Sequence, residues 1–383
     1  MLEHLGIAVR DPEPVLKLYE ALFGFVPYRS EAVEREGVRT HFLDAGTVKL
    51  ELLESLHEHS PVAKYLAKRG EGIHHLAFEV EDIDAAFARL GEAGFTLLGD
   101  APKSGADAKR IFFIHPRDTH GVLVELCQQT EQVPPATRVP FAGGSLASYA
   151  MGRAEAPALL MLHGGLGSVQ AEMLPVMREL QRQYRVVSFD FAGHAGSRDV
   201  PATPELQGLA QCEAVLDAHG VDAAHVFGFS MGGTVALHLA HARPDRVRRI
   251  AVLGVNSTWD EPTIQRAKQR ITPSFIEQHP DWTAHLAALH GPAWPKLALT
   301  LSDAIDAYPG RHLTSAQLAA LPHPVFVLAG DRDRIYPLEH TLHLYRALPD
   351  AQLAILPGAE HALHRLPPRP LADQLHRFYS STD

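Results

Sequence analysis

Two short apolar runs in this chain begin with the same residues although they lie far apart. "HLGIAVRD" starts at His4 and "HLAFEVED" starts at His75, so the pattern His-Leu-x-x-x-Val-x-Asp recurs after 71 positions. The length and apolar content of each run are typical of a half-buried or buried strand, and an aspartate just beyond it is a common helix N-cap. The pattern predicts a strand followed by a helix in each of two copies.

The repeat continues beyond these runs. Apolar residues then recur at helical spacing, and each predicted helix ends near a Gly-Phe pair, before strand-like runs that lead to Glu51 in one copy and Glu125 in the other. The predicted helical positions are Val15, Leu18 and Leu22 in the first copy and Ile83, Phe87 and Leu90 in the second. Each copy therefore predicts a strand, a helix and several strands, which makes the first part an α+β fold of paired modules.

The pattern changes after a polar stretch with a Pro-Pro pair. Apolar runs such as "PALLMLHGG" and "PVFVLAGDRD" end in glycine-rich turns and alternate with helical patterns, which indicates an α/β fold with a mostly parallel sheet. We expect one domain over residues 1–128, a linker over 129–138 and a second domain over 139–383. Residues 256–320 interrupt the alternation and contain all three tryptophans, so we expect them to form a helical cap.

Composition narrows the possible functions. The chain has 383 residues, 46% of them hydrophobic, and a formal net charge of −10, which argues against a general nucleic-acid binder. There are only two cysteines and no long uninterrupted apolar stretch, so we expect neither a disulfide scaffold nor a membrane span. The expected location is the cytoplasm.

The repeated histidines and glutamates suggest a metal site. Two copies of one module, related by a pseudo-twofold axis, would bring His4 and His75 together with Glu51 and Glu125. Two imidazoles and two carboxylates suit a divalent ion such as Co, Mn, Ni or Zn, which polarises a carbonyl oxygen while a carboxylate moves a proton. Any one of these residues alone would more often be structural, so the prediction depends on the duplicated spacing.

Residues 1–128 resemble methylmalonyl-CoA epimerase, within the vicinal oxygen chelate (glyoxalase-like) superfamily. The resemblance lies in "HLGIAVRD", "VKLELLE", "SPVAKYLAKRGEGIHHLAFEVEDIDAA" and "KRIFFIHPRDTHGVLVEL". It implies paired βαβββ modules, metal ligands at His4, Glu51, His75 and Glu125, a possible homodimer, and epimerisation of methylmalonyl-CoA or a related 2-substituted acyl-CoA. Lys103, Lys109, Arg110 and Arg117 are candidate contacts for the phosphates of CoA.

Epimerisation needs a base on each side of an enolate plane, and Glu125 fits one of the two roles. Some bacterial epimerases place a glutamate after a Gly-Val pair where this chain has Thr40 in "EGVRTHFLD". Two interpretations stay open: Glu51 is the partner base, or the domain prefers a related substrate.

The second part contains a nucleophile motif. "VFGFSMGG" places Ser230 between Gly228 and Gly232, after a predicted strand and before a predicted helix, as a nucleophile elbow requires. An HGG stretch indicates an oxyanion hole formed by the N–H groups of Gly165 and Met231. An acid after a later strand and a histidine after the last strand complete the chain order Ser, Asp, His.

Residues 139–383 thus resemble the α/β-hydrolase family, and the resemblance assigns the acid to Asp333 and the base to His361. It implies a serine hydrolase for an ester or thioester with no cofactor of its own.

Three hypotheses for the function of the whole chain follow. The chain is bifunctional toward related acyl-CoA thioesters; or its hydrolase acts on unrelated small esters; or its first domain is only a metal- or ligand-binding module or a glyoxalase-like lyase. All three expect small-molecule acyl-CoA or ester substrates, with neither nucleic acid nor a membrane as a partner.

Overall fold

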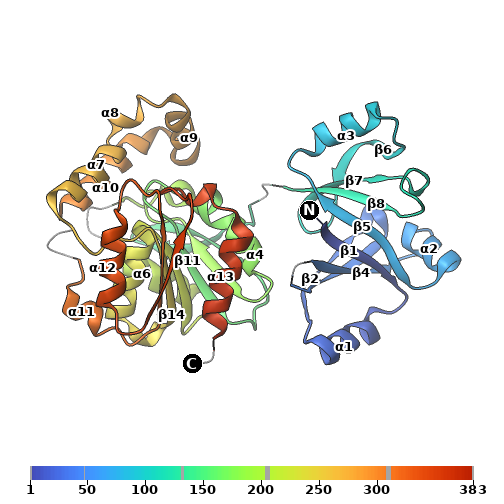
Figure 1. Cartoon of the computed structure of the whole chain (residues 1–383), viewed down its shortest axis with the longest axis horizontal. Coiled ribbons are helices and arrows are strands. Elements are labelled where there is room, and N and C mark those ends of the chain that lie inside the picture. Colours follow the sequence, from blue (N-terminus) through green and yellow to red (C-terminus); the bar gives the residue numbers. More distant parts are fainter. Residues whose placement is uncertain (1, 47, 131–132, 203–207, 308–311, 382–383) are drawn as a thin grey trace. The chain divides into compact units, whose positions relative to one another are not determined.

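The computed structural model describes residues 2–46, 48–130, 133–202, 208–307 and 312–381. The chain forms two compact units, Met1–Gln132 and Val133–Asp383 (Figure 1). Each unit has hydrophobic clusters of its own. None of the helices in the described ranges is long and apolar enough to cross a membrane.

The first unit contains the two predicted modules. The first has β1 (Leu2–Val9), α1 (Pro12–Phe23), β2 (Pro27–Val33), β3 (Val38–Asp44) and β4 (Lys49–Ser55). The second has β5 (Gly72–Glu79), α3 (Ile83–Glu92), β6 (Leu97–Ser104), β7 (Lys109–Ile114) and β8 (Val124–Gln129), and α2 (Pro61–Arg69) connects the two. The paired strand–helix–strands organisation expected from the repeat is confirmed.

The strands of both modules join into one sheet of eight, in the order β2-β3-β4-β1-β5-β8-β7-β6. β1 pairs antiparallel with β5 at the centre, while β4 runs parallel to β1 and β8 runs parallel to β5. From either edge to the centre, the strands follow in the same order within their module: second, third, fourth, first. The sheet therefore reflects the duplication of the modules. The four innermost strands, β4, β1, β5 and β8, carry the four predicted metal-site residues.

The first helix differs from its predicted packing. Asp11 caps α1 through its side chain, which accepts a hydrogen bond from the backbone N–H of Glu13, and the helix ends at Gly24, whose φ is 72°. Leu18 and Leu22, however, are 51% and 60% exposed. The helix packs through Val15, as predicted, together with Leu16 and Tyr19, so the predicted apolar face was right at Val15 and wrong at Leu18 and Leu22.

The second unit is a doubly covered, mostly parallel sheet, in the order β16-β15-β14-β13-β11-β12-β10-β9. Its strands are β9 (Thr137–Phe141), β10 (Gly144–Met151), β11 (Ala158–Leu162), β12 (Arg185–Phe189), β13 (Ala224–Phe229), β14 (Val247–Leu253), β15 (Val325–Gly330) and β16 (Ala351–Leu356). Among the described strands of this unit, only the pairings of β10, with β9 and with β12, are antiparallel. The predicted α/β fold is confirmed.

Helices cover both faces of this sheet (Figure 1). One cluster of buried residues includes side chains of α5 (Gly208–Ala218), α6 (Met231–Ala242) and α12 (Leu338–Ala347). The opposite cluster includes side chains of α4 (Leu174–Leu180) and α13 (Pro368–Ser380). Because apolar side chains lie on both faces, the central strands read as continuous apolar runs in the sequence.

Helices without a strand among them occupy the interval between β14 and β15. They are α7 (Glu261–Ile271), α8 (Pro273–Ile276), α9 (Pro280–His290), α10 (Trp294–Ala307) and α11 (Ser315–Ala319). A small cluster that includes Ile276, Leu286 and Trp294 packs against Leu166 of the sheet unit. The interval therefore has a core of its own and covers the region around Leu166.

Candidate active sites

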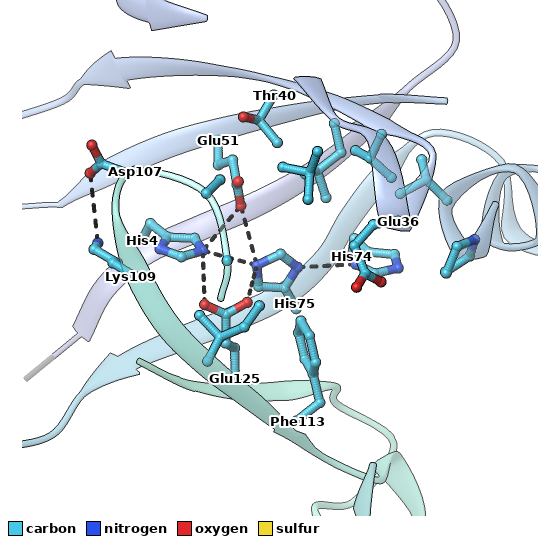
Figure 2. Close-up of a pocket in the computed structure, with 18 of the residues that line it drawn as sticks. His4, Glu36, Thr40, Glu51, His74, His75, Asp107, Lys109, Phe113 and Glu125 are labelled. Atoms are coloured by element: carbon cyan, nitrogen blue, oxygen red, sulfur yellow. Dashed lines mark hydrogen bonds and ion pairs between the residues drawn. The ribbon is translucent and has the colours of Figure 1, made fainter. Parts of the chain in front are cut away.

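The first unit brings the four repeat-related side chains into one centre. The Nε2 atoms of His4 and His75 lie 3.0 Å apart. Oε2 of Glu51 is 3.1 Å from Nε2 of His4 and 3.4 Å from Nε2 of His75. The carboxylate of Glu125 approaches the same two nitrogen atoms at 3.9 and 3.6 Å. Figure 2 shows the two glutamates on opposite sides of the histidine pair.

This arrangement has the chemistry of a metal site. Ligand atoms of His4, His75 and Glu125 all lie within 4.8 Å of one another, and an oxygen of Glu51 adds a fourth ligand atom beside them. All four side chains are at most 5% exposed. Nitrogen and oxygen ligands in this number suit a divalent ion of the Co, Mn, Ni or Zn class and leave coordination positions for a substrate. The residues fit such an ion.

The electrostatics of the centre also favour a cation. Burial acts to lower the pKa of His4, but the carboxylates of Glu51, Glu3 and Glu125 together outweigh burial and raise that pKa to about 10. Burial raises the pKa of Glu125, only partly offset by the two histidines. Burial likewise acts to raise the pKa of Glu51, but His4 and His75 outweigh it and lower that pKa. The carboxylates thus stabilise a positive charge beside His4, which a divalent ion would supply when bound in place of a proton.

Two features orient the histidines. Oε2 of Glu3 lies 2.5 Å from Nδ1 of His4, so the carboxylate accepts the Nδ1 proton and leaves Nε2 facing the centre. Gly6 lies opposite His75 on the neighbouring strand, and a Cβ there would lie 2.2 Å from the imidazole ring. A glycine at this position is therefore what gives His75 its room.

A group of four buried charged residues lies behind His4. Nζ of Lys49 is 2.6 Å from Glu3 and 2.7 Å from Asp107, and Lys109 forms ion pairs with the same two acids. Lys49, Asp107 and Lys109 are each at most 6% exposed. We call Glu3, Lys49, Asp107 and Lys109 the buried charge cluster. It fixes Glu3 in the position from which Glu3 contacts His4.

The centre opens into a cavity of about 250 Å³. Leu53, Val62, Ile111 and Phe113 are among its apolar lining residues, and Thr40 and His74 also line it. Thr40 is 2% exposed, and its hydroxyl donates a long hydrogen bond of 3.5 Å to the backbone oxygen of Glu31. Burial and the charge of His75 lower the pKa of His74 to about 4. Neither Thr40 nor His74 adds a carboxylate to the cavity.

In the second unit, Ser230, His361 and Asp333 form one hydrogen-bonded line. Nε2 of His361 is 2.9 Å from Oγ of Ser230, and Nδ1 of His361 is 2.6 Å from Oδ2 of Asp333. The other oxygen of Asp333 accepts hydrogen bonds from the backbone N–H groups of Ile335 and Tyr336. Burial acts to raise the pKa of Asp333, but the interaction with His361 and the two backbone N–H groups together outweigh it and lower that pKa.

The turn that presents Ser230 is as tight as the sequence predicts. Ser230 has φ 52° and ψ −115°, a conformation that a non-glycine residue rarely adopts. A Cβ on Gly228 would lie 2.4 Å from the backbone oxygen of Gly232, and a Cβ on Gly232 would lie 2.3 Å from that of Leu162. Both flanking glycines are therefore required by close backbone contacts.

A cavity of about 830 Å³ surrounds Ser230 and His361. Gly165 and Met231, whose N–H groups are the expected oxyanion hole, line it. The loop that holds Gly165 is fixed by Glu172, whose carboxyl accepts the N–H of Gly164 at 2.7 Å. Trp259 and Trp282 also line the cavity, whereas Trp294 is buried inside the helical interval.

Comparison with known proteins assigns the first unit. Residues 3–113 match the family described as the glyoxalase/bleomycin resistance protein/dioxygenase superfamily. The ethylmalonyl-CoA/methylmalonyl-CoA epimerase of Cereibacter sphaeroides is 43% identical over 129 residues, which are 33% of this chain and 96% of that protein. The chain belongs to this superfamily. Its first unit is epimerase-like, and the resemblance seen in the sequence is confirmed.

The second unit has the α/β-hydrolase fold. Residues 157–273 match the family of that name. A putative carbamate hydrolase of Pseudomonas savastanoi is 27% identical over 251 residues, 60% of this chain and 95% of that protein. A 2-hydroxy-6-oxo-6-phenylhexa-2,4-dienoate hydrolase from a Rhodococcus species, at 22% identity, shares the fold with a TM-score of 0.54 over 64% of this chain and 99% of that one. The chain thus joins an epimerase-like unit to a hydrolase-like unit.

The candidate phosphate contacts of the first unit lie in several environments. Nζ of Lys103 is 2.6 Å from Glu36 at the cavity wall, and Lys109 belongs to the buried charge cluster. Arg110 forms a two-bonded ion pair with Asp84, and Arg117 is bonded to Thr96. Lys103 and Lys109 line the cavity, while Arg110 and Arg117 are not among its lining residues.

Sequence reasoning missed the buried charge cluster and Glu172. Lys49 had a signal, because it stands two positions before Glu51 on β4 and alternation places both on one face of the strand. Asp107 has no such signal. It lies in a turn with a φ of 53°, and only the folded chain brings it to Lys49.

Proposed function

We propose that this chain is a bifunctional enzyme. Its first unit epimerises methylmalonyl-CoA, or a related 2-substituted acyl-CoA, with the help of a divalent ion, and its second unit hydrolyses an ester or thioester through Ser230. The observation that supports the first activity best is the placement of Glu51 and Glu125 on opposite sides of the His4–His75 pair (Figure 2).

The proposed epimerase chemistry is a proton transfer. The ion would be held by His4, Glu51, His75 and Glu125, and it would supply positive charge beside the thioester oxygen while C2 is deprotonated. Glu125, with its raised pKa, is suited to remove the proton from one face and to retain it. Since Thr40 offers no carboxylate, we assign the opposite face to Glu51.

The proposed hydrolase chemistry follows from the Ser230–His361–Asp333 line. Oγ of Ser230 attacks the carbonyl carbon as His361 takes its proton, and Asp333 holds the imidazole in the required tautomer. The N–H groups of Gly165 and Met231 stabilise the developing oxyanion. The carbonyl–oxygen or carbonyl–sulfur bond then breaks, and the leaving group receives the proton from His361. A water molecule releases the acid by the same steps.

The epimerase assignment is tested in D₂O with a Ser230→Ala background, which keeps the thioester intact. We expect a single epimer of methylmalonyl-CoA to gain one deuterium at C2 in the metal-loaded protein, and mass spectrometry reads the mass increase. His75→Ala should abolish exchange. Glu54→Gln, a change three positions from Glu51 on the same strand but outside the cavity, is the matched control.

Two outcomes would contradict the assignment. Metal binding without exchange would make the first unit a binding module, and exchange that survives His75→Ala would place the chemistry elsewhere. Labelling of Ser230 by a fluorophosphonate, together with turnover of a p-nitrophenyl ester that is lost in Ser230→Ala, tests the hydrolase separately.

A further inference from the structure

The cavity of the second unit combines an apolar wall with an unusual concentration of arginines. Its apolar side comes from both the sheet unit and the helical interval and includes Phe229, Trp259, Trp282, Leu301, Ile305 and Ile335. Arg270, Arg332, Arg334 and Arg365 line the same cavity. The chain as a whole has a formal net charge of −10. The concentration of arginines at this cavity therefore does not follow from a generally basic composition.

Three of these arginines have no acidic partner among the residues that the structure describes. The side chains of Arg270, Arg332 and Arg334 form no ion pair or hydrogen bond with any other residue that the structure describes, whereas Arg365 pairs with Glu360 at 2.8 Å. Surface arginines in this chain commonly do pair, as Arg110 does with Asp84. Within the described ranges the three guanidinium groups are therefore unpaired, and we call these residues the arginine rim.

The rim comes from two separate segments that line the cavity of Ser230. Arg332 and Arg334 flank Asp333 in the segment after β15, and both are exposed. Arg270 is half-buried near the end of α7, in the helical interval that faces the sheet unit. The acids that line the cavity do not cancel this charge. Glu360 pairs with Arg365, and burial raises the pKa of Glu172 to about 7. Asp281, which is exposed, leaves one carboxylate against three guanidinium groups.

Guanidinium groups that converge on one cavity bind phosphates, since each can donate two parallel hydrogen bonds to one anion. One guanidinium group is enough to bind a single carboxylate. The three guanidinium groups of the arginine rim therefore indicate a ligand with several anionic centres. The volume of about 830 Å³ accommodates a large ligand whose acyl part lies along the apolar wall.

We infer that the second unit hydrolyses an acyl thioester of the coenzyme A type. The acyl chain lies against the apolar wall, Ser230 attacks the thioester carbon, and the arginine rim holds the phosphates of the departing thiol. This inference rests on the proposed hydrolase function and deepens it. It also gives both units of the chain the same class of substrate.

The test uses a neutral reporter, so that only the hydrolase site is read. Hydrolysis of a p-nitrophenyl ester is followed in the full-length protein, and S-methyl-CoA is compared with S-methylpantetheine as an inhibitor. The two share the thioether arm, and S-methyl-CoA adds the phosphates and the adenosine; the salt dependence and the arginine variants separate the contribution of the phosphates from that of the adenosine. Both are used in large excess over the protein, so that binding to the first unit does not change their free concentration.

We expect S-methyl-CoA to inhibit at a concentration at least about tenfold below that of S-methylpantetheine, and added salt to reduce the ratio. Arg332→Gln combined with Arg334→Gln should bring the ratio close to one, and Arg270→Gln, which is remote from Asp333 in the chain, should lower it independently. Arg377→Gln, an exposed change on α13 outside the cavity, should keep the wild-type ratio.

Each remaining outcome overturns a specific statement. Equal inhibition by the two compounds in an active enzyme would reject recognition of phosphates. Inhibition by malonate as strong as that by S-methyl-CoA would mean that the rim binds an acyl carboxylate instead. Absence of both ester turnover and fluorophosphonate labelling of Ser230 would reject the hydrolase function itself, and this inference with it.

Discussion

At the scale of single residues, the proposed metal centre depends on groups that would not touch the ion. Glu3 is the clearest of them, because its carboxylate accepts the Nδ1 proton of His4 and is itself held by Lys49 and Lys109. Such carboxylate–histidine pairs fix the tautomer and the ring orientation of a ligand. Glu3 is thus a positioning residue for His4.

We predict that Glu3→Gln weakens binding of Co²⁺ or Zn²⁺ by about 10–100-fold. The amide can no longer accept the Nδ1 proton with a full negative charge, so the Nε2 lone pair of His4 is less basic and less well aimed. Titration calorimetry against a competing chelator measures the change.

Glu54→Gln is the control, since Glu54 lies on β4 outside the cavity. Unchanged metal affinity in Glu3→Gln, in a variant whose circular dichroism matches the wild type, would show that His4 needs no support from the buried charge cluster.

The sequence predicted the four proposed metal ligands but not the buried charge cluster behind His4. His4, Glu51, His75 and Glu125 were predictable because duplication places equivalent residues at equivalent spacings. The buried charge cluster has no counterpart in that repeat. Asp107 reaches Lys49 across 58 positions of sequence, and no local pattern encodes such a contact.

At the scale of elements, the strand–turn–helix that presents Ser230 tolerates no added atoms. We predict that Gly232→Ala destabilises the second unit by about 1–3 kcal/mol and reduces fluorophosphonate labelling of Ser230. The new methyl group would lie 2.3 Å from the oxygen of Leu162 and 2.6 Å from that of His163, and backbone atoms cannot rotate away. Tryptophan fluorescence during urea unfolding measures the loss, because all three tryptophans lie in the second unit.

Gly91→Ala is a suitable control for this substitution. Gly91 lies inside α3, where the nearest atom to an added Cβ is 3.9 Å away, so labelling of Ser230 and the fluorescence transition should both stay as in wild type. Full labelling in Gly232→Ala would contradict the argument from close contact.

The helices and strands were largely predictable from the sequence. The buried face of a helix, and the contacts between segments far apart in the chain, were not. Asp11 and the apolar spacing predicted helix α1, but Leu18 and Leu22 are exposed. This twelve-residue helix has apolar residues on two sides, so its sequence alone does not show which side packs against the sheet. The arginine rim joins a helix of the interval to the segment around Asp333. Its members are separated by some sixty positions, so only the fold brings them together.

A third element-scale feature is a group of neutral histidines behind the HGG loop. Nε2 of His163 accepts the N–H of Phe191 at 3.0 Å, while Nδ1 lies 2.8 Å from the backbone oxygen of Gly164 and donates to it. Its ring centroid is 5.0 Å from that of His194, which in turn is 5.5 Å from His290. Burial lowers the pKa of all three, that of His163 to about 3.

We predict that the second unit loses stability in mild acid. A histidine with a lowered pKa in the folded state binds fewer protons than it does when unfolded, so its contribution is complete above pH 6.5 and falls as the pH drops toward the folded pKa. Between pH 7.5 and 5.5 the free energy of unfolding should fall by about 1 kcal/mol for His163 alone, as read by tryptophan fluorescence in urea.

His163→Gln should flatten this dependence on pH by the share of one histidine, whereas His59→Gln, at an exposed position, should leave it unchanged. A free energy of unfolding that stays constant from pH 7.5 to 5.5 would mean that these imidazoles become protonated without cost.

At the scale of the whole molecule, the two centres use separate parts of the chain. The proposed metal ligands all belong to Met1–Gln132, and Ser230, Asp333 and His361 all belong to Val133–Asp383. Each unit also has its own hydrophobic clusters. The two activities therefore have no shared side chain through which loss of one would remove the other.

We predict that chelation separates the two activities. Dialysis against EDTA should abolish exchange at C2, because His4, Glu51, His75 and Glu125 alone leave the thioester oxygen without a compensating positive charge. Hydrolysis of a p-nitrophenyl ester should continue at the same rate, because the Ser230–His361–Asp333 line needs no ion. Restoring Co²⁺ should recover exchange, and Ser230→Ala should show the reverse pattern, with exchange kept and ester hydrolysis lost. A parallel fall of both activities on chelation would instead mean that the ion also supports the second unit, against the separation of the two cores.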